Sequence, residues 1–145
     1  MGLTEQFDSK VFLMEGALGE RLKREYRLFP DELLAMGAHV YDSAARQALT
    51  ELWTGYLDVA ETHGFPFLAT TPTRRLNRER IDASRYGDAI IRDNVRFLKE
   101  IQRQSSHEMF AGALLGCKGD AYRATEVLGE REAEAFHGWS IERFA

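Results

Sequence analysis

The chain has 145 residues, of which 44% are hydrophobic, and this is typical of one globular domain and not of a disordered chain. Its formal charge of −4 provides no positive field for nucleic acid or anionic lipid, so we expect neither as a partner. A single cysteine excludes an internal disulfide and any metal site built only from cysteines of this chain.

The sequence also lacks the signals that direct a chain to or through a membrane. No apolar run approaches the roughly 20 residues needed to cross a bilayer. The N-terminus has no positively charged stretch followed by an apolar one, as a secretory signal would. Gln6 stands where an N-myristoylation motif has Ser or Thr. We therefore expect a cytoplasmic protein.

Short apolar runs alternate with amphipathic segments along the whole chain. The runs suit strands buried on both faces, and apolar residues spaced by three and four indicate helices. In chain order the pattern predicts a strand over 11–14, a helix over 17–27, a short helical turn over 31–37, a helix over 42–63, a strand over 65–70, a helix over 77–84, a helix from 88 to the break at 105, a strand over 109–115 and a helix from about 130.

Two long helices carry recognisable start signals. Asp42 or Ser43 can cap the helix over 42–63, and Gly64 follows its last residue. Asp88 can cap the helix that follows it. Strands that alternate with helices through short connections predict βα units, and therefore a parallel sheet with right-handed crossovers. Three strands neither close a barrel nor complete a doubly wound sheet, so the organisation looks unfinished.

Function in parallel βα folds gathers at the carboxyl ends of the strands. Glu15 and Gly16 follow the first strand directly, and Thr71 and Thr73 follow the second. A carboxylate at this place can accept a hydrogen bond from a substrate ammonium, and hydroxyls can bind a substrate carboxylate. The structural alternatives are a helix cap with a turn glycine for the first pair and ordinary strand-end threonines for the second.

Other reactive residue types give weaker patterns. Cys117 lies next to Lys118 in a loop rich in small residues, where a lowered pKa would make it a nucleophile, although most lone cysteines are inert. The four histidines fall in different predicted elements, and no pair has metal-ligand spacing. The arginines of segment 74–80 could attract anions, but a solvated helix face is the commoner explanation.

Taken together, the three strand ends resemble the homocysteine S-methyltransferase family. The segment LMEGALGERL at 13–22 is similar to the opening of that family, where an acidic residue and glycines follow strand one. Thr71-Pro72-Thr73 resembles the Thr-x-Thr that ends its second strand, and 110–116 resembles its third strand and loop. The segments 120–122 and 130–137 are similar to its next loop and helix.

The resemblance implies a (β/α)8 TIM barrel that transfers a methyl group to the thiol of homocysteine, a reaction of methionine biosynthesis. It assigns Glu15 and Gly16 to the polar end of the amino acid, and Thr71 and Thr73 to the same substrate site. The family binds zinc through three cysteines that follow strands six and eight. Cys117 follows strand three and corresponds to neither position, so the resemblance assigns no catalytic residue and no metal ligand to this chain.

We therefore predict that residues 1–145 are the truncated N-terminal part of such a barrel, with about three βα units and flanking helices. A barrel of this kind needs about 250 residues. The expected partners are a small thiol substrate and a methyl donor, and the methyltransferase is expected to be inactive in this form, without bound zinc. Two alternatives remain open: a non-catalytic half-barrel that self-associates through its open sheet edges, as a structural or regulatory protein, and a zinc-independent family member that uses Cys117.

Overall fold

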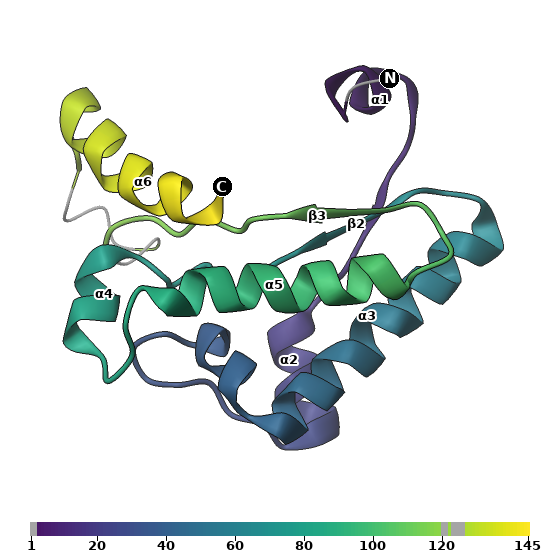
Figure 1. The fold of residues 1–145 in the computed structure, drawn as a ribbon, viewed down its shortest axis with the longest axis horizontal. Helices are drawn as coiled ribbons and strands as arrows, with labels where there is room; N and C mark the ends of the chain where they lie inside the picture. The colour runs from purple at the N-terminus through teal and green to yellow at the C-terminus, as the bar shows by residue number, and fades with distance from the viewer. Residues whose placement is uncertain (1–2, 120–121, 123–126) are drawn as a thin grey trace.

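The computed structural model describes residues 3–119, 122 and 127–145, so Asp120 and Ala121 of the motif at 120–122 lie outside the described residues. The described residues form a mixed α/β fold (Figure 1). Its elements are α1 (Leu3–Ser9), β1 (Leu13–Met14), α2 (Leu18–Tyr26), the 3-10 helix η1 (Met36–Tyr41), α3 (Ser43–His63), β2 (Phe67–Thr70), α4 (Arg78–Ala83), α5 (Ala89–Gln104), β3 (Met109–Gly112) and α6 (Glu130–Phe144).

The three strands pair in parallel in the order β1-β2-β3, which confirms the predicted parallel sheet. Leu13 lies opposite Phe67, which lies opposite Met109. Each strand is shorter than its apolar run, and β3 ends at Gly112 instead of residue 115. The amide of Thr71 still donates to the carbonyl of Gly112 at 3.0 Å, but the amide of Leu114 faces the Thr71 hydroxyl, at 3.4 Å, and not a backbone carbonyl, so the ladder does not continue.

Helices α3 and α5 cover one face of the sheet and form the core with it. Trp53 of α3 and Phe67 of β2 are fully buried, and the Trp53 ring meets the ring of Phe97 edge-on at 5.7 Å. The amphipathic pattern therefore puts its apolar stripes against the strands, as predicted. Asp42 is the cap of α3, because its carboxylate accepts a hydrogen bond from the amide of Ala45 at 2.7 Å.

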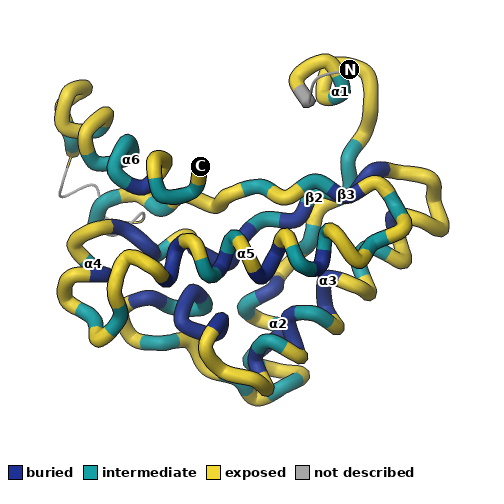
Figure 2. Tube along the Cα trace, viewed as in Figure 1, coloured by how far each residue is buried: buried dark blue, intermediate teal, exposed yellow. Residues whose placement is uncertain are grey.

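The opposite face of the sheet is much less covered. Strand periodicity puts Leu68, Thr70, Phe110 and Gly112 on this face, and all four are only half-buried. Met14 on the edge strand is 52% exposed. In Figure 1, α1 and α6 lie toward this side near the two ends of the sheet, and Figure 2 shows the trace of β3 mostly as intermediate or exposed. The described residues therefore form an open sheet, and its closure into a barrel stays a prediction.

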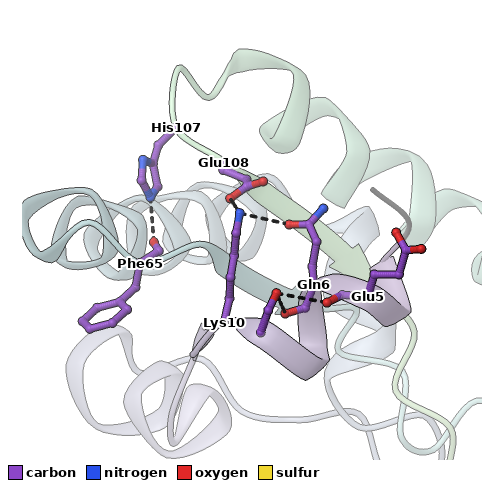
Figure 3. Close-up of polar contacts among 7 residues, drawn as sticks. Glu5, Gln6, Lys10, Phe65, His107 and Glu108 are labelled. Atoms are coloured by element: carbon purple, nitrogen blue, oxygen red, sulfur yellow. Dashed lines mark hydrogen bonds and ion pairs between the residues drawn. The ribbon is translucent and has the colours of Figure 1, made fainter.

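Polar side chains tie the loops together at the amino end of the sheet (Figure 3). The ammonium of Lys10 lies 3.2 Å from a carboxylate oxygen of Glu108, which joins the end of α1 to the start of β3. His107 donates from Nε2 to the carbonyl of Phe65 at 2.7 Å, which joins the loops that precede β3 and β2. These contacts align the strand starts.

Two local predictions differ from the structure, and one helix was not predicted. Helix α1 was not anticipated, because its seven residues have no apolar period and it is held by the Phe7 ring, 4.4 Å from Phe12. The predicted turn over 31–37 is a bridge between Asp31 and Ala35 followed by η1. Asp88 precedes α5 but makes no capping hydrogen bond.

Each difference has a physical reason. Ala35 has a φ of 49° and a ψ of −129°, a conformation incompatible with a helix, so the chain reverses there before η1 begins. The Asp88 carboxylate is instead 3.1 Å from Nε of Arg143, and this pair connects α5 with α6. A contact between distant helices replaces the local cap.

Candidate functional site

At the carboxyl end of the sheet lies a carboxylate that has hydrogen-bond partners on only one of its two oxygens. Glu15 follows β1, and its Oε1 accepts hydrogen bonds from the amide of Thr70 at 2.8 Å and from the hydroxyl of Thr70 at 2.6 Å. Its Oε2 is buried and has no hydrogen-bond partner among the described residues. A buried acceptor without a hydrogen bond lowers the stability of the fold, so a donor that reached this oxygen would bind favourably.

A cavity of about 330 Å³ opens beside this carboxylate. The loops that follow β1 and β2, the end of β2 and the first turn of α2 form most of its wall, together with one residue of η1 and one residue after β3. Its lining residues are Glu15, Ala17, Leu18, Gly19, Glu20, Met36, Thr70, Thr71, Pro72, Arg74 and Leu114. The cavity therefore combines two carboxylates, those of Glu15 and Glu20, with one guanidinium, hydroxyls and apolar side chains, a mixture found in small-molecule sites.

The two predicted threonines occupy different depths. Thr71 lines the cavity, and its hydroxyl lies 2.7 Å from the hydroxyl of Thr73. Thr73 is fully buried and donates to the carbonyl of Leu114 at 2.9 Å. Because its proton goes to Leu114, the Thr73 hydroxyl accepts from Thr71. Thr73 thus joins the loop after β2 to the loop after β3, and only Thr71 reaches the cavity.

Gly16 lies in the tight connection between β1 and α2. Its carbonyl accepts a hydrogen bond from the hydroxyl of Tyr56 in α3, and the Arg21 guanidinium lies 5.3 Å from the centre of the Tyr56 ring. Ala17, the next residue, adopts the left-handed conformation with a φ of 50° and lines the cavity. Left-handed backbone at a non-glycine residue stores strain, and such residues cluster at functional sites.

A second cavity, of about 310 Å³, adjoins the first, and Gly19, Glu20, Met36 and Arg74 line both. His39 lines it and is 93% buried, with an Nε2 that has no hydrogen-bond partner among the described residues. Burial lowers the pKa of His39 below its ordinary value, although Asp42 and Asp31 act in the opposite direction. This imidazole is therefore held in its neutral form.

The structure brings the predicted residues Glu15 and Thr71 together at one cavity, and places Thr73 beneath it. Gly16 contributes its carbonyl to the scaffold through Tyr56. Sequence reasoning missed Thr70, whose amide and hydroxyl orient the Glu15 carboxylate. Its position as the last residue of an apolar run was the available signal, because that position points to the strand end.

The described residues contain no arrangement typical of a metal site and no helix typical of a membrane span. No group of three His, Cys, Asp or Glu side chains among the described residues lies in a metal-binding arrangement. The only cysteine, Cys117, is exposed, and one thiolate does not fit a zinc site that needs three. In the described part of the chain no helix is long and apolar enough to cross a membrane.

The chain matches no family model, no curated protein and no solved structure at a significant level.

Proposed function

We propose that this chain binds homocysteine or a related amino-acid thiol in the cavity beside Glu15, as a homocysteine S-methyltransferase-like protein. The observation that carries the proposal is the Glu15 carboxylate, which has one oxygen held by Thr70 and the other buried without a hydrogen-bond partner in the described part of the chain. A substrate ammonium supplies the missing donor and the opposite charge in one group. Charge-assisted hydrogen bonds of this type are among the strongest in proteins.

The other lining groups suit the rest of such a ligand. The Arg74 guanidinium can bind the carboxylate of the amino acid, and Leu18, Met36 and Leu114 offer apolar contact to its thiol-bearing side chain. The Thr71 hydroxyl donates to Thr73, so it can offer the amino acid only an acceptor, which suits the ammonium. The cavity of about 330 Å³ also has room for a molecule of this size. Gly16 supports the site indirectly, through the carbonyl that accepts from Tyr56.

Methyl transfer requires a thiolate, because the thiolate is the nucleophile. A free thiol is mostly protonated at neutral pH, so the protein must stabilise its deprotonated form. The family meets this need with zinc on three cysteines, and the single cysteine of this sequence does not fit that site. We therefore propose substrate binding, without methyl transfer, for the chain alone. Methylation of homocysteine by the purified chain would contradict this part of the proposal.

The fold supports the same proposal at a coarser level. Parallel strands in consecutive order, with helices α3 and α5 on one face, are what successive βα units of a barrel have in common. The sparsely covered face with Leu68 and Phe110 corresponds to a barrel interior, where other strands supply the packing. We propose that the sheet is part of a (β/α)8 barrel.

Calorimetric titration with homocysteine tests substrate binding. The wild-type chain should bind it, and Glu15→Gln should weaken binding about tenfold to a hundredfold, because a charged hydrogen bond contributes roughly 1.5–3 kcal/mol. Glu108→Gln is the matched control, because it makes the same chemical change at the other end of the sheet. No binding by wild type, or equal binding by both variants, would contradict the proposal.

A second candidate is a half-barrel that associates with another copy of itself. Met14 is 52% exposed and Val11 is 65% exposed at the β1 edge, and exposed edges with apolar side chains favour strand pairing between chains. Light scattering should then give a mass that rises to that of a dimer with concentration, and Met14→Lys should reduce the association. A monomer at all concentrations would exclude this candidate.

A further inference from the structure

A third cavity, of about 390 Å³, has an unusual charge distribution. It lies between the loop that joins β2 to α4 and the loop that follows β3. The guanidinium-bearing residues Arg74, Arg75 and Arg80 line it from one loop and helix, and Leu114, Leu115 and Cys117 line it from the other loop. No carboxylate lies among the described residues that line this cavity.

The positive charges of this cavity are largely uncompensated. Neither Arg74 nor Arg75 makes a side-chain hydrogen bond or ion pair with any described residue. Arg80 donates from Nη2 to the carbonyl of Gly119 at 3.0 Å, and its other N–H groups remain for a ligand. Elsewhere an arginine such as Arg143 has a carboxylate partner. Among the described residues that line it, this cavity therefore has three guanidiniums and no carboxylate, in a chain of net charge −4.

The loops that carry these groups are fixed against each other. A Cβ on Gly116 would lie 1.6 Å from the carbonyl oxygen of Arg74, so the two backbones are in direct contact. The hydroxyl of Thr73 bonds to the carbonyl of Leu114 across the same junction. Asn77 caps α4 by accepting from the amide of Arg80 at 3.0 Å, which fixes the backbone of that arginine. The cavity is thus held in shape before any ligand binds.

We propose that this cavity binds a small ligand that carries a dianionic oxyanion, a phosphate monoester or a dicarboxylate, attached to an apolar group. Guanidinium groups bind such oxyanions through paired N–H donors. Leu114 and Leu115, which are 39% and 37% exposed, provide the contact surface for the apolar part of the ligand. The carboxyl ends of parallel βα strands are also where phosphate sites occur.

The inference is separate from the proposed homocysteine site. Glu15 and Thr70 do not line this cavity, and Arg75 and Arg80 do not line the cavity beside Glu15. Arg74 and Leu114 border both cavities, so the test uses Arg75. Loss of homocysteine binding in Glu15→Gln with unchanged anion binding would show that the two sites are independent.

Cys117 provides a reporter for the test, because it is the only cysteine, is exposed and lines the cavity. The measurement is the rate of its alkylation by iodoacetamide, followed by mass spectrometry, with increasing phenyl phosphate. We expect phenyl phosphate to slow alkylation at saturation at least fivefold, and phenol, which has the same ring and no dianion, to leave the rate unchanged. Stronger protection by glutarate than by phenyl phosphate would assign the site to dicarboxylates, and the reverse to phosphate esters.

Arg75→Gln should raise the phenyl phosphate concentration for half-protection about tenfold, which is the usual effect of removing one charged hydrogen-bond donor. Arg92→Gln is the matched control, because Arg92 is exposed on α5 and does not line the cavity. Circular dichroism checks that both variants fold. Equal protection by phenol and phenyl phosphate, or equal half-protection concentrations in the Arg75→Gln and Arg92→Gln variants, would overturn the inference, as would equal protection by inorganic phosphate and phenyl phosphate.

Discussion

The two ends of the sheet differ in how their polar groups are used. At the amino end, Lys10 pairs with Glu108 and His107 donates to the carbonyl of Phe65 (Figure 3). At the carboxyl end, an oxygen of Glu15 and the side chain of Arg75 have no partner among the described residues. The protein itself therefore satisfies these polar groups at the amino end, and it leaves groups unpaired at the carboxyl end, where we propose that ligands bind.

The two ends of the sheet therefore differ in role: polar groups at the amino end stabilise the fold, and we propose that polar groups at the carboxyl end bind ligands. Contacts that are complete within the chain contribute to folding alone, and groups left incomplete cost stability unless a ligand completes them. Parallel βα folds show the same division in general, with function at the carboxyl ends of the strands. Paired substitutions at the two ends test whether the division holds here.

The largest effect is expected for Gly116→Ala. The new Cβ would collide with the Arg74 backbone, so the loops must separate, at a cost of about 1–3 kcal/mol in the free energy of unfolding and with loss of Cys117 protection by phenyl phosphate. Gly64→Ala is the comparison at the amino end, where φ is +69° and a Cβ has open space. It should cost about 1 kcal/mol and leave ligand binding unchanged. Urea denaturation measures both, and equal effects on binding would break the comparison.

Thr73→Val should cost about 2 kcal/mol. The substitution keeps the shape of the side chain but removes a fully buried hydroxyl that bonds to Thr71 and to the Leu114 carbonyl. Thr62→Val makes the same change near the amino end, where the exposed hydroxyl donates to the Asp58 carbonyl of its own helix, and should be nearly neutral. Thermal unfolding of both variants checks the difference, which similar melting temperatures would contradict.

The pH dependence of stability should report on His39. Burial lowers its pKa in the folded chain, so the unfolded chain binds a proton more readily. Stability is therefore complete above the unfolded pKa of about 6.5 and falls as the pH drops toward the folded pKa, by at most about 1.4 kcal/mol per pH unit. His39→Gln should flatten this slope in urea titrations between pH 5 and pH 7. A slope that stays the same would assign the titration to another group.

The smallest effect is expected for the pair of Lys10 and Glu108. Both side chains are more than 40% exposed, so a double-mutant cycle with alanine should give a coupling free energy below about 1 kcal/mol. The coupling should decrease in high salt, because exposed charges are screened. Homocysteine binding should be unaffected in both single variants. A change in that affinity would show that the two ends of the sheet communicate.

Much of the fold follows from local patterns, and the site follows only in part. The strands and the helices α3 and α5 were predictable because short apolar runs and apolar stripes have fixed periods. The position of Glu15 after β1 was enough to place it at the carboxyl end. The bond from Thr70 to Glu15 was not predictable, because it joins residues 55 positions apart through the register of β1 on β2. The cavity of Arg75 likewise depends on two distant loops.

The parallel register has a consequence for the order in which the chain folds. Leu13 pairs with Phe67, and Phe67 pairs with Met109, so β1 and β2 each pair with a strand more than 40 residues further along the chain. The backbone hydrogen bonds within helices α3 and α5 are local, so these helices can form as soon as their own residues are synthesised. Closing loops of this length costs entropy before any strand contact compensates for it. We therefore expect the sheet to assemble late, on a surface that the two helices have already built.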